Sequence, residues 1–204
     1  MRKGRRCMKV IFIVGAPGSG KSFVAEAIAT RLSIPRIVRT DTVREIMRAC
    51  IQRNDITETL HRSAILACEL APEGEDANIW GFMQQAKDLV PGIEAALKQA
   101  KKEGKDLIIE GIHLLPNLIK IPDGIDFKHI CLIVESEEQH KAQILAQGQD
   151  RSSYKIDNFF KAHCFQDFLL KQSESTMVKI VNNDNSSNMM DVIIDAVLGE
   201  NTIL

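Results

Sequence analysis

The stretch Gly15-Ala16-Pro17-Gly18-Ser19-Gly20-Lys21-Ser22 decides the fold of this chain. It fits the phosphate-binding pattern in which four residues separate a glycine from Gly-Lys-Ser. The apolar run over residues 10–14 precedes it and has the length and branching of a buried strand. Residues 23–32 follow, with apolar side chains at helical spacing and alanines between them. Strand, glycine turn and helix together form the context that this motif requires.

The chemistry of the motif predicts a nucleotide site. Glycines let the backbone adopt conformations that a Cβ forbids, so successive N–H groups converge on one point. That point is also the positive end of the helix dipole, which favours a polyphosphate. We expect ATP or GTP to bind here with Mg²⁺, with Lys21 on the β- and γ-phosphates and the Ser22 hydroxyl on the metal. The candidate nucleotide contacts are Gly15, Ala16, Pro17, Gly18, Ser19, Gly20, Lys21, Ser22 and Phe23.

The composition narrows the class of protein. A chain of 204 residues with 45% hydrophobic content suits one domain with a sizeable core. The formal net charge of −1 offers no global field for nucleic acid or an anionic membrane. No apolar run approaches the roughly 20 residues needed to span a bilayer. The five cysteines are scattered without a C-x-x-C pattern, so we expect neither disulfides nor zinc and favour a reducing, cytoplasmic compartment.

We expect a short leader followed by one domain. Residues 1–8 are rich in arginine and lysine, like the start of a signal peptide, but the apolar run after them leads straight into the phosphate loop. That arrangement argues against export. Residues 9–204 show no internal repeat or linker, so we expect a single domain with a small lid over about residues 138–155.

Two acidic residues follow predicted strands. Asp41 comes directly after a short strand expected over residues 36–39, and Glu110 ends a buried strand expected over residues 106–110. The carboxyl edge of a parallel sheet is where α/β proteins bind their ligands. A purely structural role as a cap is the alternative for each. We favour Asp41 as the group that faces the acceptor hydroxyl, and Glu110 as support for the Mg²⁺ shell.

Helices are expected between these strands. Thr42 and Glu45 form a capping box that predicts a helix running through residue 50. Helical spacing continues over residues 54–70 and again, in a long amphipathic pattern, over residues 82–100. Pro91 either kinks the long helix or lies in the first turn of a second helix. Gly104 supplies its end.

The second half of the chain continues the alternation. We expect strands over residues 129–134 and 178–181, and helices over about 136–146, 159–173 and 189–197, the first opened by a Ser136–Gln139 capping box. The polar residues 182–185 lie either near an adenine or in a plain turn. Five strands joined by helices predict a mostly parallel sheet covered on both faces, in a P-loop NTPase or kinase-type α/β fold.

Two segments are more specific than the phosphate loop. Residues 34–48 (IPRIVRTDTVREIMR) and 108–116 (IIEGIHLLP) resemble runs of the 2-phosphoglycerate kinases, P-loop enzymes that make 2,3-bisphosphoglycerate from 2-phosphoglycerate and ATP. Weaker similarity continues through residues 154–170. The resemblance implies that the phosphate loop binds ATP and Mg²⁺, and that a small molecule accepts the phosphoryl group. By the same resemblance Asp41 and Arg44 face the acceptor, and Glu110 with His113 lines the same cleft.

The expected lid departs from the family pattern. Gln143, Gln147 and Gln149 stand where basic residues are expected, which leaves Arg151 to close over the phosphates. Transfer to an already phosphorylated triose needs positive charge for two anions, so this departure leaves a less charged acceptor open as an alternative. We expect 2-phosphoglycerate or a related small anionic metabolite as the acceptor.

Other functions of the same motif stay open. A P-loop kinase for a nucleotide sugar, an antibiotic or a polynucleotide end is one alternative. A nucleotide-binding regulatory protein with little turnover is another, motivated by the lid. A GTPase is disfavoured because the sequence has no clear Asn-Lys-x-Asp motif to read the base.

Overall fold

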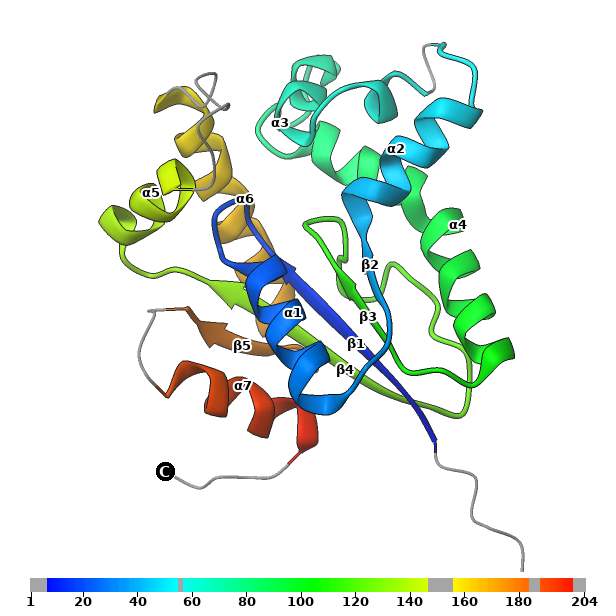
Figure 1. Cartoon of the computed structure of the whole chain (residues 1–204). Coiled ribbons are helices and arrows are strands. Elements are labelled where there is room, and N and C mark those ends of the chain that lie inside the picture. The colour runs from blue at the N-terminus through cyan, green and yellow to red at the C-terminus, as the bar shows by residue number, and fades with distance from the viewer. Residues whose placement is uncertain (1–6, 55–56, 147–155, 184–187, 200–204) are drawn as a thin grey trace, which may run out of the picture.

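The computed structural model describes residues 7–54, 57–146, 156–183 and 188–199. The described strands are β1 (Met8–Gly15), β2 (Ile37–Arg39), β3 (Leu107–Glu110), β4 (Ile125–Ile133) and β5 (Lys179–Asn182). They form one five-stranded sheet in the order β2-β3-β1-β4-β5, and every neighbouring pair is parallel. The predicted five-stranded sheet is therefore confirmed (Figure 1).

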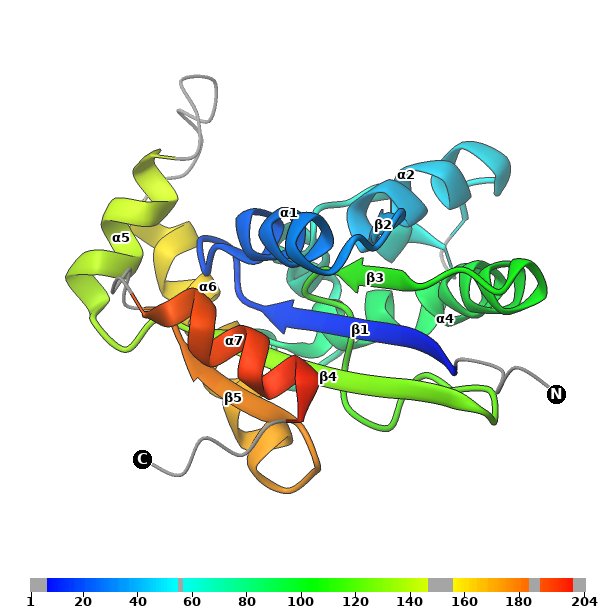
Figure 2. The same ribbon diagram turned by 60° about the horizontal axis from the view of Figure 1, so that its bottom comes forward.

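Helices connect and cover these strands. The described helices are α1 (Lys21–Leu32), α2 (Thr40–Cys50), α3 (Ala64–Ala67), α4 (Trp80–Glu103), α5 (Glu137–Ala146), α6 (Ile156–Glu174) and α7 (Met189–Leu198), with 3₁₀ turns η1 (Glu58–His61) and η2 (Cys68–Leu70). Helices α1 and α7 cover one face of the sheet, and α4 and α6 cover the other (Figures 1 and 2). None of the described helices combines the length and apolarity that crossing a bilayer requires.

The central strand β1 is buried on both faces. Ile11 and Ile13 pack with the side chains of α1 and α7, whereas Val10, Phe12 and Val14 pack with those of α4 and α6. Side chains alternate along a strand, so a run of consecutive apolar residues supplies both cores at once. Burial of each such side chain contributes about 1.5–3 kcal/mol. This packing explains why an uninterrupted apolar run precedes the phosphate loop.

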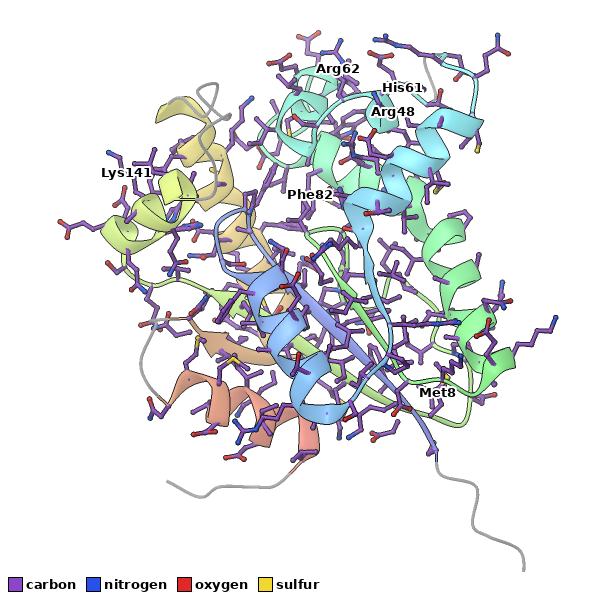
Figure 3. All side chains as sticks on the ribbon, in the orientation of Figure 1. Met8, Arg48, His61, Arg62, Phe82 and Lys141 are labelled. Carbon is purple, nitrogen blue, oxygen red and sulfur yellow. The ribbon has the colours of Figure 1, made fainter. Side chains whose placement is uncertain are left out.

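The core against α4 is the larger of the two and includes an aromatic stack. Phe82 on α4 lies near the centre of the molecule, close to the carboxyl end of β1 (Figure 3). Its ring stacks on Phe165 of α6 with 4.8 Å between centroids, and its edge contact with Phe168 has a separation of 5.9 Å. These contacts join α4 to α6 beneath the edge of the sheet where the site forms.

Helix α2 begins two residues earlier than its predicted capping box. Arg39 is the N-cap residue and no side chain caps the helix, so Thr42 lies inside the first turn and the expected box with Glu45 is wrong. Glu45 pairs instead with Arg44 and Arg48. Because β2 leads straight into α2, the acidic Asp41 lies in the first turn, where the helix dipole favours a negative charge.

The helix expected over residues 54–70 is also wrong. The described part of this segment forms η1, α3 and η2, three short pieces with Ser63 capping α3 through a hydrogen bond from the Leu66 N–H. Backbone carbonyls that a continuous helix would use internally are taken by side chains from neighbouring helices. Gln85 bonds the carbonyls of Thr59 and Arg62, and Arg44 also bonds that of Arg62. Tertiary hydrogen bonds therefore replace the local ones.

Three local signals are confirmed. Residues 80–103 form one continuous helix with an exposed Pro91 inside it, so a second helix does not begin there. Gly104 ends that helix in the left-handed conformation, with φ of 62°. Ser136 Oγ accepts the Gln139 N–H at 3.2 Å at the start of α5, which is the first half of the predicted capping box, whereas the Gln139 side chain donates to the carbonyl of Asn183.

Gly81 on α4 tests how closely the helices pack. A Cβ at this position would lie 2.0 Å from the backbone carbonyl of Ala67. Alanine is a better helix former than glycine by about 1 kcal/mol, but overpacking costs about 1–3 kcal/mol. We expect Gly81→Ala to lower the free energy of unfolding measured in urea. Ala95→Gly, at an exposed position of the same helix, is the control, because it measures the difference in helix propensity between alanine and glycine without a change in packing. A more stable Gly81→Ala variant would contradict the packing.

Candidate active site

The phosphate loop joins β1 to α1 at the carboxyl edge of the sheet. Gly18 and Gly20 have φ of 84° and 83°, a left-handed conformation that residues with a Cβ rarely adopt. Gly15 is required for a different reason, because a Cβ there would lie 2.6 Å from the carbonyl of Leu132. Helix α1 then starts at Lys21, two residues before its predicted start. The strand, loop and helix predicted around this motif are all present.

A cleft of about 840 Å³ opens beside the loop. Its lining residues come from the loop and α1, from the end of β2, from α2, from the start of α3 and from the end of β3: Pro17, Gly18, Gly20, Lys21, Ser22, Phe23, Arg39, Asp41, Arg44, Glu45, Ser63, Ala64, Ile65, Leu66, Glu110, Gly111 and Ile112. Another hollow of about 820 Å³, lined mainly by lysines such as Lys98 and Lys120, lies near the end of α4, at the opposite edge of the sheet. The cleft beside the loop is the candidate active site because residues predicted to bind the nucleotide, among them Lys21 and Ser22, line it.

Lys21 lies at the base of the cleft. Its Nζ donates a hydrogen bond of 2.8 Å to the carbonyl of Ala16 within the same loop. Burial lowers the pKa of Lys21, and the negative charges of Glu110 and Asp41 act in the opposite direction. The ammonium is thus held by a neutral carbonyl and lacks a close carboxylate partner among the described residues, as suits a group that binds an incoming anion.

Ser22 and Glu110 meet across the cleft. Ser22 Oγ donates to Glu110 Oε1 at 2.8 Å, although the two residues are 88 positions apart. The same carboxylate oxygen lies 3.2 Å from Nε of Arg39, whose Nη2 bonds Glu26 at 2.6 Å. Glu110 is 4% exposed. The predicted neighbourhood of a hydroxyl and a carboxylate beside the phosphate loop is therefore present in the geometry.

Asp41 and Arg44 lie on α2 and line the same cleft. Asp41 is exposed in the first turn of the helix. The Arg44 guanidinium is largely engaged: Nη1 donates to the carbonyls of Leu60 at 3.1 Å and Arg62 at 2.9 Å, and Nη2 donates to Glu45. An arginine has five N–H donors, so two of them have no partner among the described residues. Arg44 thus holds the segment before α3 and still faces the cleft.

The expectation that His113 lines the cleft is wrong. Its side chain is 1% exposed and lies in a chain of hydrogen bonds between the start of α2 and α4. Nδ1 is 2.9 Å from Thr40 Oγ1, and Nε2 is 2.7 Å from Gln85 Oε1. Because the Gln85 amide nitrogen donates to two carbonyls, its oxygen must accept, so the His113 proton lies on Nε2 and Thr40 donates to Nδ1. His113 therefore lies in the interior behind the cleft, where it links Thr40 of α2 to Gln85 of α4.

The structure adds residues that sequence reasoning missed. Arg39 ends β2 and pairs with Glu110, and Gly111 leaves room for Thr40, whose Oγ1 would be 1.8 Å from a Cβ there. Asp41 and Glu110 are selected by the rule that α/β proteins bind ligands at the carboxyl edge of a parallel sheet. This edge rule applies equally to Arg39, which also ends a strand. No sequence signal singles out Gln85, because a buried glutamine looks like any polar residue of an amphipathic helix. Arg151, expected in the lid, lies outside the described residues.

The comparisons with known proteins agree with this geometry. A family model described as an AAA domain matches residues 10–109. The 2-phosphoglycerate kinase of Methanocaldococcus jannaschii is 33% identical over 195 residues, which cover 92% of this chain and 62% of that protein. The chain is a homologue of the 2-phosphoglycerate kinases. The resemblance of the sequence motifs to this family is thereby confirmed.

A second relative matches a similar share of this chain and of its own length. The 2-phosphoglycerate kinase of Pyrococcus horikoshii is 31% identical over 201 residues, covering 95% of this chain and 66% of that protein. The chain therefore spans somewhat less than two thirds of the length of these curated relatives.

Solved structures share the fold. The crystal structure of TT1252 from Thermus thermophilus superposes with a TM-score of 0.59 at 15% sequence identity. The superposition covers 97% of this chain and 100% of TT1252. A gluconokinase from Sinorhizobium meliloti has a TM-score of 0.50 at 16% identity, covering 96% of this chain and 93% of that one. The P-loop kinase-type fold predicted from the sequence is confirmed.

Two histidines, the buried His113 and the half-buried His129, predict a pH dependence of stability. Burial lowers the pKa of both His113 and His129 to about 4. Between about pH 6.5 and 4 the unfolded chain binds protons that the folded chain excludes, so the free energy of unfolding falls as the pH falls. Each histidine adds a slope of up to about 1.4 kcal/mol per pH unit.

Urea unfolding measured from pH 7 to pH 5 checks this prediction. His113→Gln removes one titrating group, so its slope should be shallower than that of the parent chain, and His129→Phe should act in the same direction. An unchanged slope in His113→Gln would contradict a buried neutral imidazole at this position.

Proposed function

We propose that this chain transfers the γ-phosphoryl group of ATP to a hydroxyl of a small anionic metabolite, with 2-phosphoglycerate as the first acceptor to test. The observation that carries the proposal is the meeting of the Lys21-Ser22 pair with Glu110 and Asp41 in one cleft. The relatives named 2-phosphoglycerate kinase support the choice of acceptor.

The phosphate loop binds the ATP phosphates in this proposal. Its backbone N–H groups and the N-terminus of α1 supply positive potential, and Lys21 exchanges the Ala16 carbonyl for the phosphate oxygens. These donors are fixed before the reaction, so they stabilise charge on the transferring group without reorganising. Phe23, 66% exposed at the mouth of the cleft, adds an apolar contact.

The residues present fit Mg²⁺. Ser22 Oγ and the Glu110 carboxylate lie side by side and are oxygen donors of the kind that this ion prefers. We propose that Ser22 holds the ion directly and that Glu110 accepts from a water of its shell. When bound, the ion would offset negative charge on the phosphate oxygens. The Ser22–Glu110 hydrogen bond keeps both groups in place beforehand.

Asp41 faces the acceptor in this proposal. It accepts the proton of the acceptor hydroxyl, whose oxygen bonds to the γ-phosphorus as the bond from phosphorus to the ADP oxygen breaks. The two Arg44 N–H groups that have no partner in the described part of the chain bind a carboxylate or phosphate of the acceptor, a task suited to a planar guanidinium. Asp41 is exposed in the first turn of α2, so an acceptor can reach it from solvent.

The charges of the cleft leave room for a further cation. Among its lining residues, Lys21, Arg39 and Arg44 are balanced by Asp41, Glu45 and Glu110. The cleft therefore has no excess positive charge to balance the ATP phosphates and an anionic acceptor when both are bound. We propose that residues 138–155 act as a lid of the single domain over residues 9–204, behind a basic leader over residues 1–8, and that Arg151 supplies this charge over the phosphates.

Acceptor-dependent turnover is the first test of the proposal. ATP-to-ADP conversion is measured with Mg²⁺, with and without 2-phosphoglycerate, and phosphate NMR identifies the product. We expect ADP and 2,3-bisphosphoglycerate to form together, and Lys21→Ala to abolish both because it removes the cation from the loop. ATP binding without turnover on any acceptor would identify a regulatory protein instead and would overturn the kinase proposal.

Asp41→Asn tests the acceptor side. The substitution keeps the size of the side chain and removes its basicity, so we expect a folded protein that binds ATP with unchanged affinity. Its kcat should fall about 10²–10⁴-fold, the range for loss of a general base. Asp191→Asn, at an exposed position on α7, is the matched control and should leave kcat unchanged. Near-normal transfer by Asp41→Asn would remove this residue from the mechanism.

A further inference from the structure

The outer side of the phosphate loop is held by two side chains that no step above uses. His140 of α5 contacts the carbonyl of Pro17 through Nε2 at 2.7 Å. Asn183, directly after β5, donates from Nδ2 to the carbonyl of Ser19 at 2.8 Å. A carbonyl can only accept, so the His140 proton lies on Nε2. Two carbonyls of the loop are thus paired with side chains that come 123 and 164 residues later.

The glycines of the loop make these contacts possible. A Cβ at Gly18 would lie 2.3 Å from Cγ1 of Ile144 and 3.2 Å from the His140 ring. A Cβ at Gly20 would lie 2.3 Å from Nδ2 of Asn183. Helix α5 and the end of β5 therefore pack directly on the loop backbone. The two glycines serve this packing as well as the left-handed turns.

Both residues are themselves anchored, His140 by packing of its ring and Asn183 through its backbone. His140 is fully buried, and its ring packs against Phe159 with 5.8 Å between centroids. The backbone of Asn183 donates to the carbonyl of Ile133 at 2.8 Å and accepts from Nε2 of Gln139 at 3.2 Å. Because Gln139 precedes His140 on α5, one turn of this helix holds both contacts. The loop is framed by β4, β5 and α5 together.

We propose that His140 and Asn183 are positioning residues that hold the phosphate loop in its phosphate-binding shape by pairing the carbonyls of Pro17 and Ser19. A peptide unit whose carbonyl is held outward has its own N–H held in the opposite direction, since the unit is planar, so pairing the Pro17 and Ser19 carbonyls orients the N–H groups of Gly18 and Gly20. The loop amides are therefore oriented by α5 and β5 before the nucleotide arrives. This inference rests on the proposed function, because it concerns the affinity for ATP.

Matched variants separate the hydrogen bond from the packing. His140→Phe keeps a buried ring and loses the donor, whereas His140→Gln offers an amide N–H at a similar reach. Asn183→Leu keeps the approximate volume and loses the donor. Titration calorimetry with Mg·ATP, and with inorganic tripolyphosphate, gives the dissociation constants of the full chain. Circular dichroism and the melting temperature report folding in the absence of nucleotide.

We expect His140→Phe and Asn183→Leu each to raise the dissociation constant for both ligands about tenfold, since each leaves a loop carbonyl without its partner. His140→Gln should restore most of the affinity. His163→Phe is the control: His163 packs beside His140 with 6.4 Å between ring centroids but bonds no loop carbonyl among the described residues. It should bind both ligands like the parent chain.

The outcomes distinguish this inference from the proposed function. Parent-like affinity in folded His140→Phe and Asn183→Leu would overturn the inference and leave the kinase proposal standing. Equal weakening by His140→Phe, His140→Gln and His163→Phe would assign the effect to packing and would also overturn it. A parent chain that binds neither ATP nor tripolyphosphate would overturn both proposals. If Asn183→Leu does not fold, the three histidine variants decide.

Discussion

The parallel pairing of β1 with β3 is the constraint on which the candidate site depends. Ile13 lies opposite Glu110 in this ladder, so the chain enters the phosphate loop directly beside the carboxylate that bonds Ser22. On the other side of β3, Arg39 pairs with Glu110 and leads into the first turn of α2. Three segments distant in the sequence meet because parallel strands end at the same edge of a sheet.

A second constraint shapes the acceptor side of the cleft. The buried chain from Thr40 through His113 to Gln85 ties the start of α2 to α4, and Gln85 continues it to the carbonyls of the segment before α3. Each polar group named here has a partner, and a satisfied buried network specifies one arrangement, whereas a broken one carries a large penalty. The wall that carries Asp41 is therefore set by the interior of the molecule.

The two sides of the cleft are supported by different parts of the chain. Helix α4 and β3 support the acceptor side, while α5 and the end of β5 support the phosphate loop. Substitutions outside the cleft are therefore expected to act on different sides of it, depending on which element they disturb. Disturbance of His140 is expected to change nucleotide affinity, whereas disturbance of Gln85 acts on the wall around Asp41. Cleft residues alone do not account for the geometry of the site.

The sequence by itself determined the local elements and the chemistry of the loop. The apolar run before Gly15, the left-handed glycines and the Ser136 cap depend on each residue and its near neighbours, so they are readable from the chain. The edge rule also selected Asp41 and Glu110, because a strand end is a local feature. Resemblance to a family supplied the expected acceptor.

Only the tertiary structure decided the strand order, the burial of His113 and the break in the helix expected over residues 54–70. It also decided the roles of Gln85, His140 and Asn183. Their partners lie 23 to 164 residues away, and no local pattern distinguishes a polar side chain that will bond a distant carbonyl from one that will face water. Backbone groups must be paired when they are buried, and the folded chain alone determines which side chain arrives to pair them.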